Sequence, residues 1–292
     1  MTRPILFVAV AAGLAALTAG PGPARAAEGY DNCTGFIDSL PATITTQGTW
    51  CLRKDVSTNM TSGSAITINT NNVTLDCNHF KIGGLAAGLG TTAHGVSAAS
   101  RFNATVRNCN LRGFYRGISF SGSGGGHLVE DNSFDGNTLV SISVTHAPGS
   151  TIRRNIIVDT GGSTVSTSVA VGIVAVGGVD ILDNTVNGVA PTGTDANAYG
   201  IQTDTNGQGS ISGNRIRGLA STGTGAPLGI WTNNSGRGVF FENIVQGPGP
   251  GVAGGVGVRC HTNAATARSN VILGFETGVL NCLNSSNSVN AN

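Results

Sequence analysis

The fold is decided by the stretch Ile181-Leu182-Asp183-Asn184-Thr185-Val186-Asn187-Gly188, whose pattern of apolar-x-x-Asn-x-apolar-x-Gly returns along the 292-residue chain. The same pattern occurs at Val129–Gly136, Ile211–Gly218, Phe240–Gly247 and Ala267–Gly274. Val106–Gly113 follows it with Cys109 in the Asn place, and Ile152–Asp159 follows it with Asp159 in the Gly place. Asn tolerates left-handed backbone angles, and stacked Asn amides can hydrogen-bond along a ladder. The pattern therefore predicts one turn type at the same place in each repeat.

A second motif, Gly followed by Ile or Val, alternates with the first. It occurs at Gly95-Val96, Gly117-Ile118, Gly172-Ile173, Gly200-Ile201, Gly229-Ile230, Gly257-Val258 and Gly278-Val279, and Ser141-Ile142 fills the remaining place. Each repeat of roughly 21 to 31 residues thus holds three short segments with the alternation of β-strands. One repeat cannot bury its apolar face alone, whereas repeats stacked in register place Ile beneath Ile in a continuous core. The sequence predicts an all-β solenoid that begins near Ala65.

The first repeat carries a resemblance to a known family. Its opening, Asn-Val-Thr-Leu-Asp-Cys-Asn at 72–78 followed by Ile82-Gly83-Gly84, is similar to the first rung of exported bacterial β-helix-repeat proteins. The chain resembles the right-handed parallel β-helix (pectate-lyase-like) superfamily. The resemblance implies a single-stranded right-handed parallel β-helix of about 8–9 rungs. Members include polysaccharide lyases, glycoside hydrolases, epimerases, adhesins and tailspikes, so the fold implies action on or binding of polysaccharide without fixing the reaction.

The N-terminal residues are predicted to be a signal peptide, 1–26. Arg3 supplies the positive charge, Ile5–Ala19 the apolar region, and Ala24-Arg25-Ala26 the cleavage site. No later stretch is long and apolar enough to span a membrane, so we expect a secreted protein, periplasmic or extracellular. Residues 27–64, with Trp50, are expected to form an N-terminal cap, and residues 65–292 the β-helix.

The charge balance argues against a nucleic-acid partner. Without Arg3 and Arg25, the chain has 14 basic and 15 acidic residues. Nucleic-acid-binding proteins normally carry a strong basic excess, which is absent here. We therefore discount nucleic acid, and a polysaccharide or other glycan is the partner that the resemblance implies.

Six cysteines in an exported chain indicate disulfides. Many pairings are open, and the repeat suggests the one that joins near neighbours: Cys33–Cys51, Cys77–Cys109 and Cys260–Cys282. The chain has no Cys-x-x-Cys, and no His lies near a cysteine at zinc-ligand spacing. No metal site and no cofactor are expected. Calcium sites of pectate-lyase-like proteins use clustered carboxylates on neighbouring strands, and the outward column with Asp204 contains only one.

One outward-facing patch stands out when the repeats are aligned. With the Ile or Val of the second motif pointing inward, the third and fifth positions point outward. These columns contain mainly small or apolar residues. In three consecutive repeats they become polar and aromatic: Gln202, Asp204, Trp231, Asn233, Arg259 and His261. Neighbouring rungs lie about 4.8 Å apart, so these side chains are expected to form one surface.

The patch has the composition of a sugar site. Trp231 offers an apolar face for a pyranose ring, and Gln202 and Asn233 can hydrogen-bond hydroxyl groups. Arg259 could hold a carboxylate. The competing interpretation is a chance cluster on a solvated sheet face.

Asp204 and His261 are the candidate catalytic residues. They are expected two rungs apart, at about 10 Å, which suits an acid and a base on either side of a bond or water. Polygalacturonase-like enzymes carry an Asp-Asp pair, Gly-His-Gly and Arg-x-Lys, and this chain has none of these. Two hypotheses therefore stay open: a polysaccharide lyase or glycoside hydrolase, and a non-catalytic carbohydrate-binding or adhesin-like protein.

The remaining charged, histidine and loop residues are assigned structural roles. Alternating charges on neighbouring rungs predict cross-strand ion pairs among Arg107, Glu130 and Arg153 and among Asp131, Arg154 and Asp183. The isolated histidines are expected at the surface: His79, His94, His127 and His146. Long insertions all precede the second motif, at 160–170, 189–198, 219–227 and 248–255, and could wall a cleft. The short polar segment 284–292 is a poor cap, which leaves oligomerisation through that end open.

Overall fold

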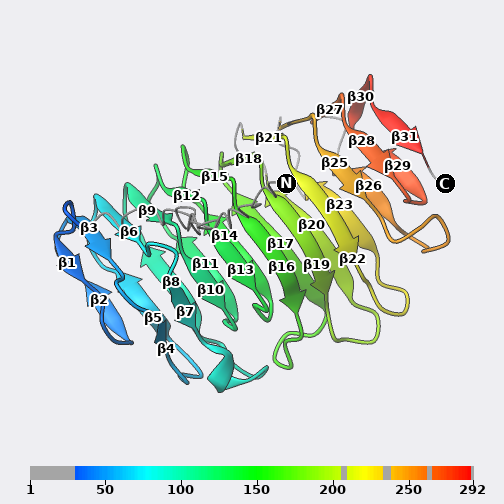
Figure 1. Cartoon of the computed structure of the whole chain (residues 1–292). Helices are drawn as coiled ribbons and strands as arrows, with labels where there is room; N and C mark the ends of the chain where they lie inside the picture. Colours follow the sequence, from blue (N-terminus) through cyan, green and yellow to red (C-terminus); the bar gives the residue numbers. More distant parts are fainter. Residues whose placement is uncertain (1–29, 205–208, 233–237, 262–264, 291–292) are drawn as a thin grey trace, which may run out of the picture.

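A computed structural model describes residues 30–204, 209–232, 238–261 and 265–290. Within these ranges the chain winds through three parallel sheets, which Figure 1 shows running side by side from the N-terminal to the C-terminal rungs. The right-handed parallel β-helix predicted from the sequence is confirmed. The predicted signal peptide lies outside the described residues.

Each sheet takes one strand from each rung. Sheet A contains β1 (Gly35–Phe36), β3 (Gly48–Cys51), β6 (Val73–Asp76), β9 (Ala104–Arg107), β12 (Leu128–Glu130), β15 (Thr151–Arg153), β18 (Asp180–Leu182), β21 (Ser210–Ser212), β24 (Val239–Phe241), β27 (Thr266–Arg268) and β30 (Leu283–Ser285). Sheet B contains β2 (Ala42–Ile44), β5 (Ser64–Ile68), β8 (His94–Ala99), β11 (Arg116–Ser121), β14 (Val140–Thr145), β17 (Val169–Val176), β20 (Asn197–Asp204), β23 (Pro227–Thr232), β26 (Val256–Arg259) and β29 (Thr277–Leu280). Sheet C contains β4 (Val56–Ser57), β7 (Lys81–Gly83), β10 (Asn110–Arg112), β13 (Ser133–Asp135), β16 (Ile156–Gly161), β19 (Thr185–Ala190), β22 (Arg215–Leu219), β25 (Ile244–Gln246), β28 (Val271–Leu273) and β31 (Ser288–Asn290). A short 3-10 helix, η1 (Leu85–Ala87), follows β7.

The sheets begin inside the segment expected to be a cap. From Ser64 onward, the described strands β5 to β31 form nine rungs of three strands. One further rung, β2 to β4, precedes them and pairs in parallel with β5, β6 and β7. The reason is hydrophobic continuity: Ile44, Leu52 and Val56 are buried and extend the core columns by one level. The parallel sheets therefore start one rung before Ala65.

The predicted stacking of apolar residues forms the core. Every residue in the Ile or Val column of the second motif from Val96 to Val258 is fully buried, and each pairs in register with the next: Val96, Ile118, Ile142, Ile173, Ile201, Ile230 and Val258. Burying one such side chain stabilises the fold by roughly 1.5–3 kcal/mol. The register of sheet B therefore follows directly from the sequence motif.

A ladder of buried Asn side chains fixes the turn between sheets A and C. Each Asn Nδ2 donates to Oδ1 of the Asn one rung further on, at 2.8–3.0 Å, through Asn132, Asn155, Asn184, Asn214, Asn243, Asn270 and Asn287. Each of these Oδ1 atoms from Asn155 onward also accepts a backbone N–H from the rung before. The ladder thus ties seven successive turns together.

The left-handed residue of this turn is the one before the Asn. Asp131 and Asp183 both have φ of 55°, and Glu242 has φ of 56°. The left-handed conformation predicted for the Asn is thus adopted by the preceding residue. The physical reason for Asn is instead its amide, which both donates and accepts hydrogen bonds and so can link rung to rung in a ladder.

Removing one ladder residue should therefore be costly. In Asn184→Ala, the amide of Asn155 and the carbonyl of Ile152 lose a partner in the dry interior. We expect a loss of about 3 kcal/mol in the free energy of unfolding, measured by denaturant titration. Asn187→Ala, on the outer face of β19, is the matched control and should change stability by less than about 0.5 kcal/mol. Equal losses in both variants would contradict the ladder's role.

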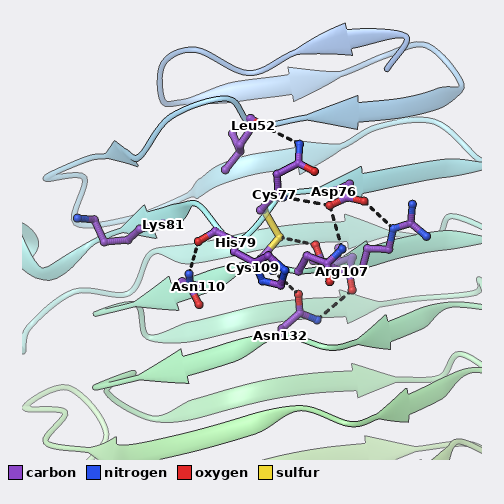
Figure 2. Close-up of a disulfide and its surroundings, with 12 residues drawn as sticks. Leu52, Asp76, Cys77, His79, Lys81, Arg107, Cys109, Asn110 and Asn132 are labelled. Atoms are coloured by element: carbon purple, nitrogen blue, oxygen red, sulfur yellow. Dashed lines mark hydrogen bonds and ion pairs between the residues drawn. A yellow bond between two sulfur atoms is a disulfide. The ribbon is translucent and has the colours of Figure 1, made fainter. Parts of the chain in front are cut away.

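The three disulfides join the cysteine pairs that the repeat suggested: Cys33–Cys51, Cys77–Cys109 and Cys260–Cys282. Figure 2 shows the second of them at the start of the Asn ladder, because the backbone N–H of Cys109 donates to Asn132 Oδ1 at 3.0 Å. The disulfide continues the column toward the N-terminus, where Asn is replaced by Cys.

Part of the ion-pair pattern predicted from the alternating charges is present on the outer face of sheet A, whereas among the described residues neither Arg107–Glu130 nor Arg154–Asp183 forms an ion pair. Arg153 and Arg154 both contact Glu130, and Arg154 also contacts Asp131 at 2.7 Å. The hydrogen bond from Arg154 lowers the pKa of Asp131. Arg107 pairs with Asp76 at 2.8 Å, as Figure 2 shows, which extends the ion-pair face by one rung.

His127 is not at the surface, contrary to the sequence prediction. It is 3% exposed, its ring packs against Phe120, and its Nδ1 accepts the backbone N–H of Ala104 at 3.2 Å. Burial lowers the pKa of His127 to about 4. The prediction failed because an isolated His gives no sequence signal of burial.

The buried His127 makes stability depend on pH. The pKa of His127 in the folded state lies below the unfolded value near 6.5, so the unfolded state binds more protons between these two pH values. The folded state therefore loses stability as the pH is lowered through this window. Going from pH 7 to pH 4.5 should cost roughly 2 kcal/mol through this residue, measured by denaturant titration. His127→Gln should reduce that loss, whereas His79→Gln, at an exposed position, should leave it unchanged. An identical pH profile in His127→Gln and the parent would refute this assignment.

Candidate functional site

The outer face of sheet B holds the predicted patch. Its third-position column runs in register from β8 to β29 through Ser97, Ser119, Ser143, Val174, Gln202, Trp231, Arg259 and Leu280. Gln202, Trp231 and Arg259 therefore lie on three neighbouring strands, as the aligned repeats indicated. Gln202 and Trp231 are half-buried, and Arg259 is exposed.

Tyr199 belongs to this surface and was missed from the sequence. Its ring centroid lies 4.8 Å from that of Trp231, with 50° between the ring planes. Aromatic pairs at this separation stabilise one another and present a broad apolar face. Burial raises the pKa of Tyr199, and the charge of Arg259 opposes that shift. Arg259 is thus close enough to Tyr199 to influence it electrostatically.

The column that contains Tyr199 explains why it was missed. The residues that directly precede the Gly of the second motif form a column of their own on sheet B. In this column Val171 pairs with Tyr199, and Tyr199 pairs with Leu228. This column is largely apolar, and Val140 and Val171 form a small buried cluster separate from the main core, with Val174 and Tyr199 packed against it. Tyr199 lies one residue before Gly200, outside the two outward positions that follow the motif. A column that begins one residue before the Gly contains it.

The candidate catalytic residues lie at the ends of the strands. Asp204 closes β20 beside Val176, and its Oδ1 is buried with no hydrogen-bond partner among the described residues. His261 is exposed and follows Cys260, which the disulfide to Cys282 anchors. Asn233 lies outside the described residues. On the described outward columns of sheet B, Asp204 is the one carboxylate, so the two-carboxylate arrangement of most glycosidases is not assembled there.

The insertions form a stacked wall at the start of the sheet B strands. Gly193 N–H donates to Thr167 O at 2.8 Å, and Thr222 N–H donates to Ala196 O at 3.1 Å, so successive loops hydrogen-bond to one another. Thr224 N–H donates to Asp195 Oδ1, and this bond lowers the pKa of Asp195. All of these loops enter sheet B from the same side, as the sequence indicated. Hydrogen bonds thus join the loops that precede β17, β20 and β23 into one stacked edge.

A hollow lies on the outer face of sheet C, where no sequence pattern predicts a site. It has a volume of about 410 Å³ and is lined by residues of β7, β10 and β13 and by the preceding turns. Its lining includes two ion pairs, Lys81–Asp55 and Arg112–Asp135. It faces away from the Trp231 surface because it belongs to another sheet.

The fold and these two surfaces define a parallel β-helix protein with outward polar and aromatic columns. The chain belongs to the family described as "Periplasmic copper-binding protein (NosD)", whose sequence profile matches residues 30–247. Comparison with curated proteins finds no match.

Solved structures of phage tailspikes share the fold. The tailspike protein of E. coli bacteriophage HK620 in complex with a pentasaccharide is 14% identical, with a TM-score of 0.50, and the match covers 85% of this chain and 58% of the tailspike. A mutant of that tailspike in complex with a hexasaccharide is also 14% identical, with a TM-score of 0.46, and the match covers 87% of this chain and 53% of the tailspike. The chain thus spans somewhat over half the length of these proteins.

The copper of the family description finds no matching ligand set in this chain. Copper sites in proteins are built from Cys and Met sulfur and from His nitrogen. All six cysteines are in disulfides, the chain has two Met, and its five His lie on different rungs. Among the described residues there is no group of three or more His, Cys, Asp or Glu that could hold a metal ion. The segments outside the described ranges contain no His and no Cys. The residues present do not fit a copper centre.

The disulfide-bonded chain is therefore expected to take up copper only substoichiometrically. The measurement is metal content after incubation with Cu(I) or Cu(II) and gel filtration. The reduced, unfolded chain, with six free thiols, is the positive control and should bind Cu(I). One equivalent of copper retained by the folded, oxidised chain would contradict this expectation.

Among the described residues, no helix has the length and hydropathy that a membrane span requires.

Proposed function

We propose that this chain is an exported glycan-binding protein that holds a sugar against Tyr199 and Trp231 on the outer face of sheet B. The observation that carries the proposal is the aromatic pair at 4.8 Å, with Gln202 on one neighbouring strand and Arg259 on the other. A half-buried indole offers a flat apolar face, and amide and guanidinium groups beside it can orient hydroxyl or carboxylate groups.

Rigid strands support this use. Trp231 lies on β23, an interior strand of sheet B, which pairs in parallel with β20 on one side and β26 on the other. Binding sites on strands hold their geometry better than sites on loops. The stacked insertions beside the sheet could limit the direction in which a chain of sugars lies. The HK620 tailspike, which has been solved with a pentasaccharide, shares the fold and so is compatible with this proposal by analogy only.

Binding is favoured over catalysis at this surface. A lyase or hydrolase would need Asp204 and His261 to reach the same bond, and a retaining or inverting glycosidase needs a second carboxylate. The buried Oδ1 of Asp204 favours a structural or positioning role. Export is proposed from the predicted signal peptide, and the family description as periplasmic supports it.

Trp231→Ala should abolish glycan binding, because it removes the apolar face while the strand pairing stays. A glycan array followed by calorimetry with the best ligand is the measurement, and we expect at least a tenfold loss in affinity, about 1.4 kcal/mol. Trp231→Phe keeps an aromatic ring and should retain most of the binding.

Two outcomes would count against the proposal. Unchanged binding by Trp231→Ala would place the glycan elsewhere on the molecule. Release of unsaturated or reducing ends from any polysaccharide, lost in both Asp204→Asn and His261→Ala, would show that the surface is catalytic.

A further inference from the structure

The hollow on sheet C is lined by residues that take no part in the Trp231 surface on sheet B. It lies between two ion pairs on different rungs, Lys81 Nζ–Asp55 Oδ2 at 3.1 Å and Arg112 Nε–Asp135 Oδ2 at 2.7 Å. Figure 2 shows part of it, where Lys81 extends from β7 and Asn110 lies beside the backbone of His79. The hollow spans four rungs, about 14 Å along the helix axis at about 4.8 Å per rung.

Small residues between long ones create the space. One column of sheet C reads Lys81, Asn110 and Ser133 on neighbouring strands. The next column contains Gly83 beside Arg112, and Gly83 has no side chain to fill the surface. The long side chains therefore stand as walls around a floor of short ones.

An apolar hollow of about 190 Å³ continues from the polar one. It shares Lys81 and Arg112 with it and is otherwise lined by Ser57, Thr58, Gly83, Leu85 and Ala86. Leu85 is 52% exposed, so an apolar side chain lies open to solvent at this point. The combined groove is polar at one end and apolar at the other.

The charges of the groove are already compensated. Lys81 binds Asp55 through both its ammonium group and its backbone N–H, and the backbone hydrogen bond chiefly lowers the pKa of Asp55. Arg112 is paired with Asp135 through its guanidinium group. A charged ligand would have to break one of these pairs, whereas an uncharged ligand with donors and acceptors leaves both intact.

The floor is rigid and polar. Asn110 donates its amide N–H to His79 O, which fixes the side chain and leaves its Oδ1 as an acceptor. Cys109, directly before Asn110, is tied to Cys77 on the preceding rung by the disulfide that Figure 2 shows. Two successive rungs under the groove are therefore covalently joined, so the groove is set before a ligand arrives.

We infer that this groove is a second site, for an uncharged oligosaccharide that carries acetamido groups. The acetamido methyl would lie over Gly83 against Leu85, and the amide and ring hydroxyl groups would bond Asn110 and Ser133. The inference rests on the polar and apolar ends of the groove and on its compensated charges, and it does not depend on glycan binding at the Trp231 surface.

Titration of the full, disulfide-bonded chain with the N-acetylglucosamine trimer tests this inference, with the glucose trimer as the matched probe that lacks acetamido groups. Calorimetry or ligand-observed NMR should show binding of the first at least tenfold tighter than of the second. Leu85→Asp, at an exposed position that should not disturb folding, and Gly83→Leu, which fills the apolar hollow, should each weaken binding at least tenfold. Trp231→Ala should leave it unchanged.

Several results would overturn the inference. They are no binding by the parent chain at millimolar trimer, equal binding of the two trimers, and undiminished binding in Leu85→Asp. Loss of binding in Trp231→Ala alone would assign the trimer to sheet B and remove the second site. Salt-sensitive binding of a polyuronate or an acidic peptide at Lys81 and Arg112, without trimer binding, would show that the ion pairs open for charged ligands.

Discussion

In-register stacking of the rungs is the constraint on which the rest of the molecule depends. Every inward Ile or Val of sheet B lies on its counterpart in the next rung, and the Asn ladder fixes the turn between sheets A and C at each level. Because side chains in a strand alternate between faces, a slip of one residue would turn the whole core outward. The buried amides resist such a slip, since each would lose partners on two rungs.

The same constraint creates the functional surfaces. Once the register is fixed, every outward position forms a straight column, and residues about 28 positions apart in sequence become neighbours, as Gln202 and Trp231 do. A polar residue in a single repeat therefore stays isolated among its neighbours, whereas polar residues at the same position in three successive repeats lie side by side and form one polar surface. Sheet A uses its columns for ion pairs, sheet B for an aromatic pair with polar neighbours, and sheet C for a groove between ion pairs.

Much of this could be predicted from the sequence because the repeat is strong. The strand columns, the partners of the cysteines and the adjacency of Gln202, Trp231 and Arg259 follow from aligning two motifs. What escaped prediction lacks periodicity. Tyr199 lies one column before the motif, and His127 is buried by contacts with Phe120 and the backbone of Ala104. The sheet C groove depends on a missing side chain at Gly83 and on the conformations of Lys81 and Arg112, which the pattern does not determine. The family match shows membership but not a copper site, because the cysteines are held in disulfides and the histidines lie on different rungs.

The chain contains two tryptophans, Trp50 in the first rungs and Trp231 on sheet B, so fluorotryptophan labelling and ¹⁹F NMR would give one signal for each. Titration with a glycan identified on the array tests the central claim directly. The glycan-binding account predicts that the Trp231 signal shifts in a saturable way while the Trp50 signal stays in place. A saturable interaction that leaves the Trp231 signal unmoved would contradict it.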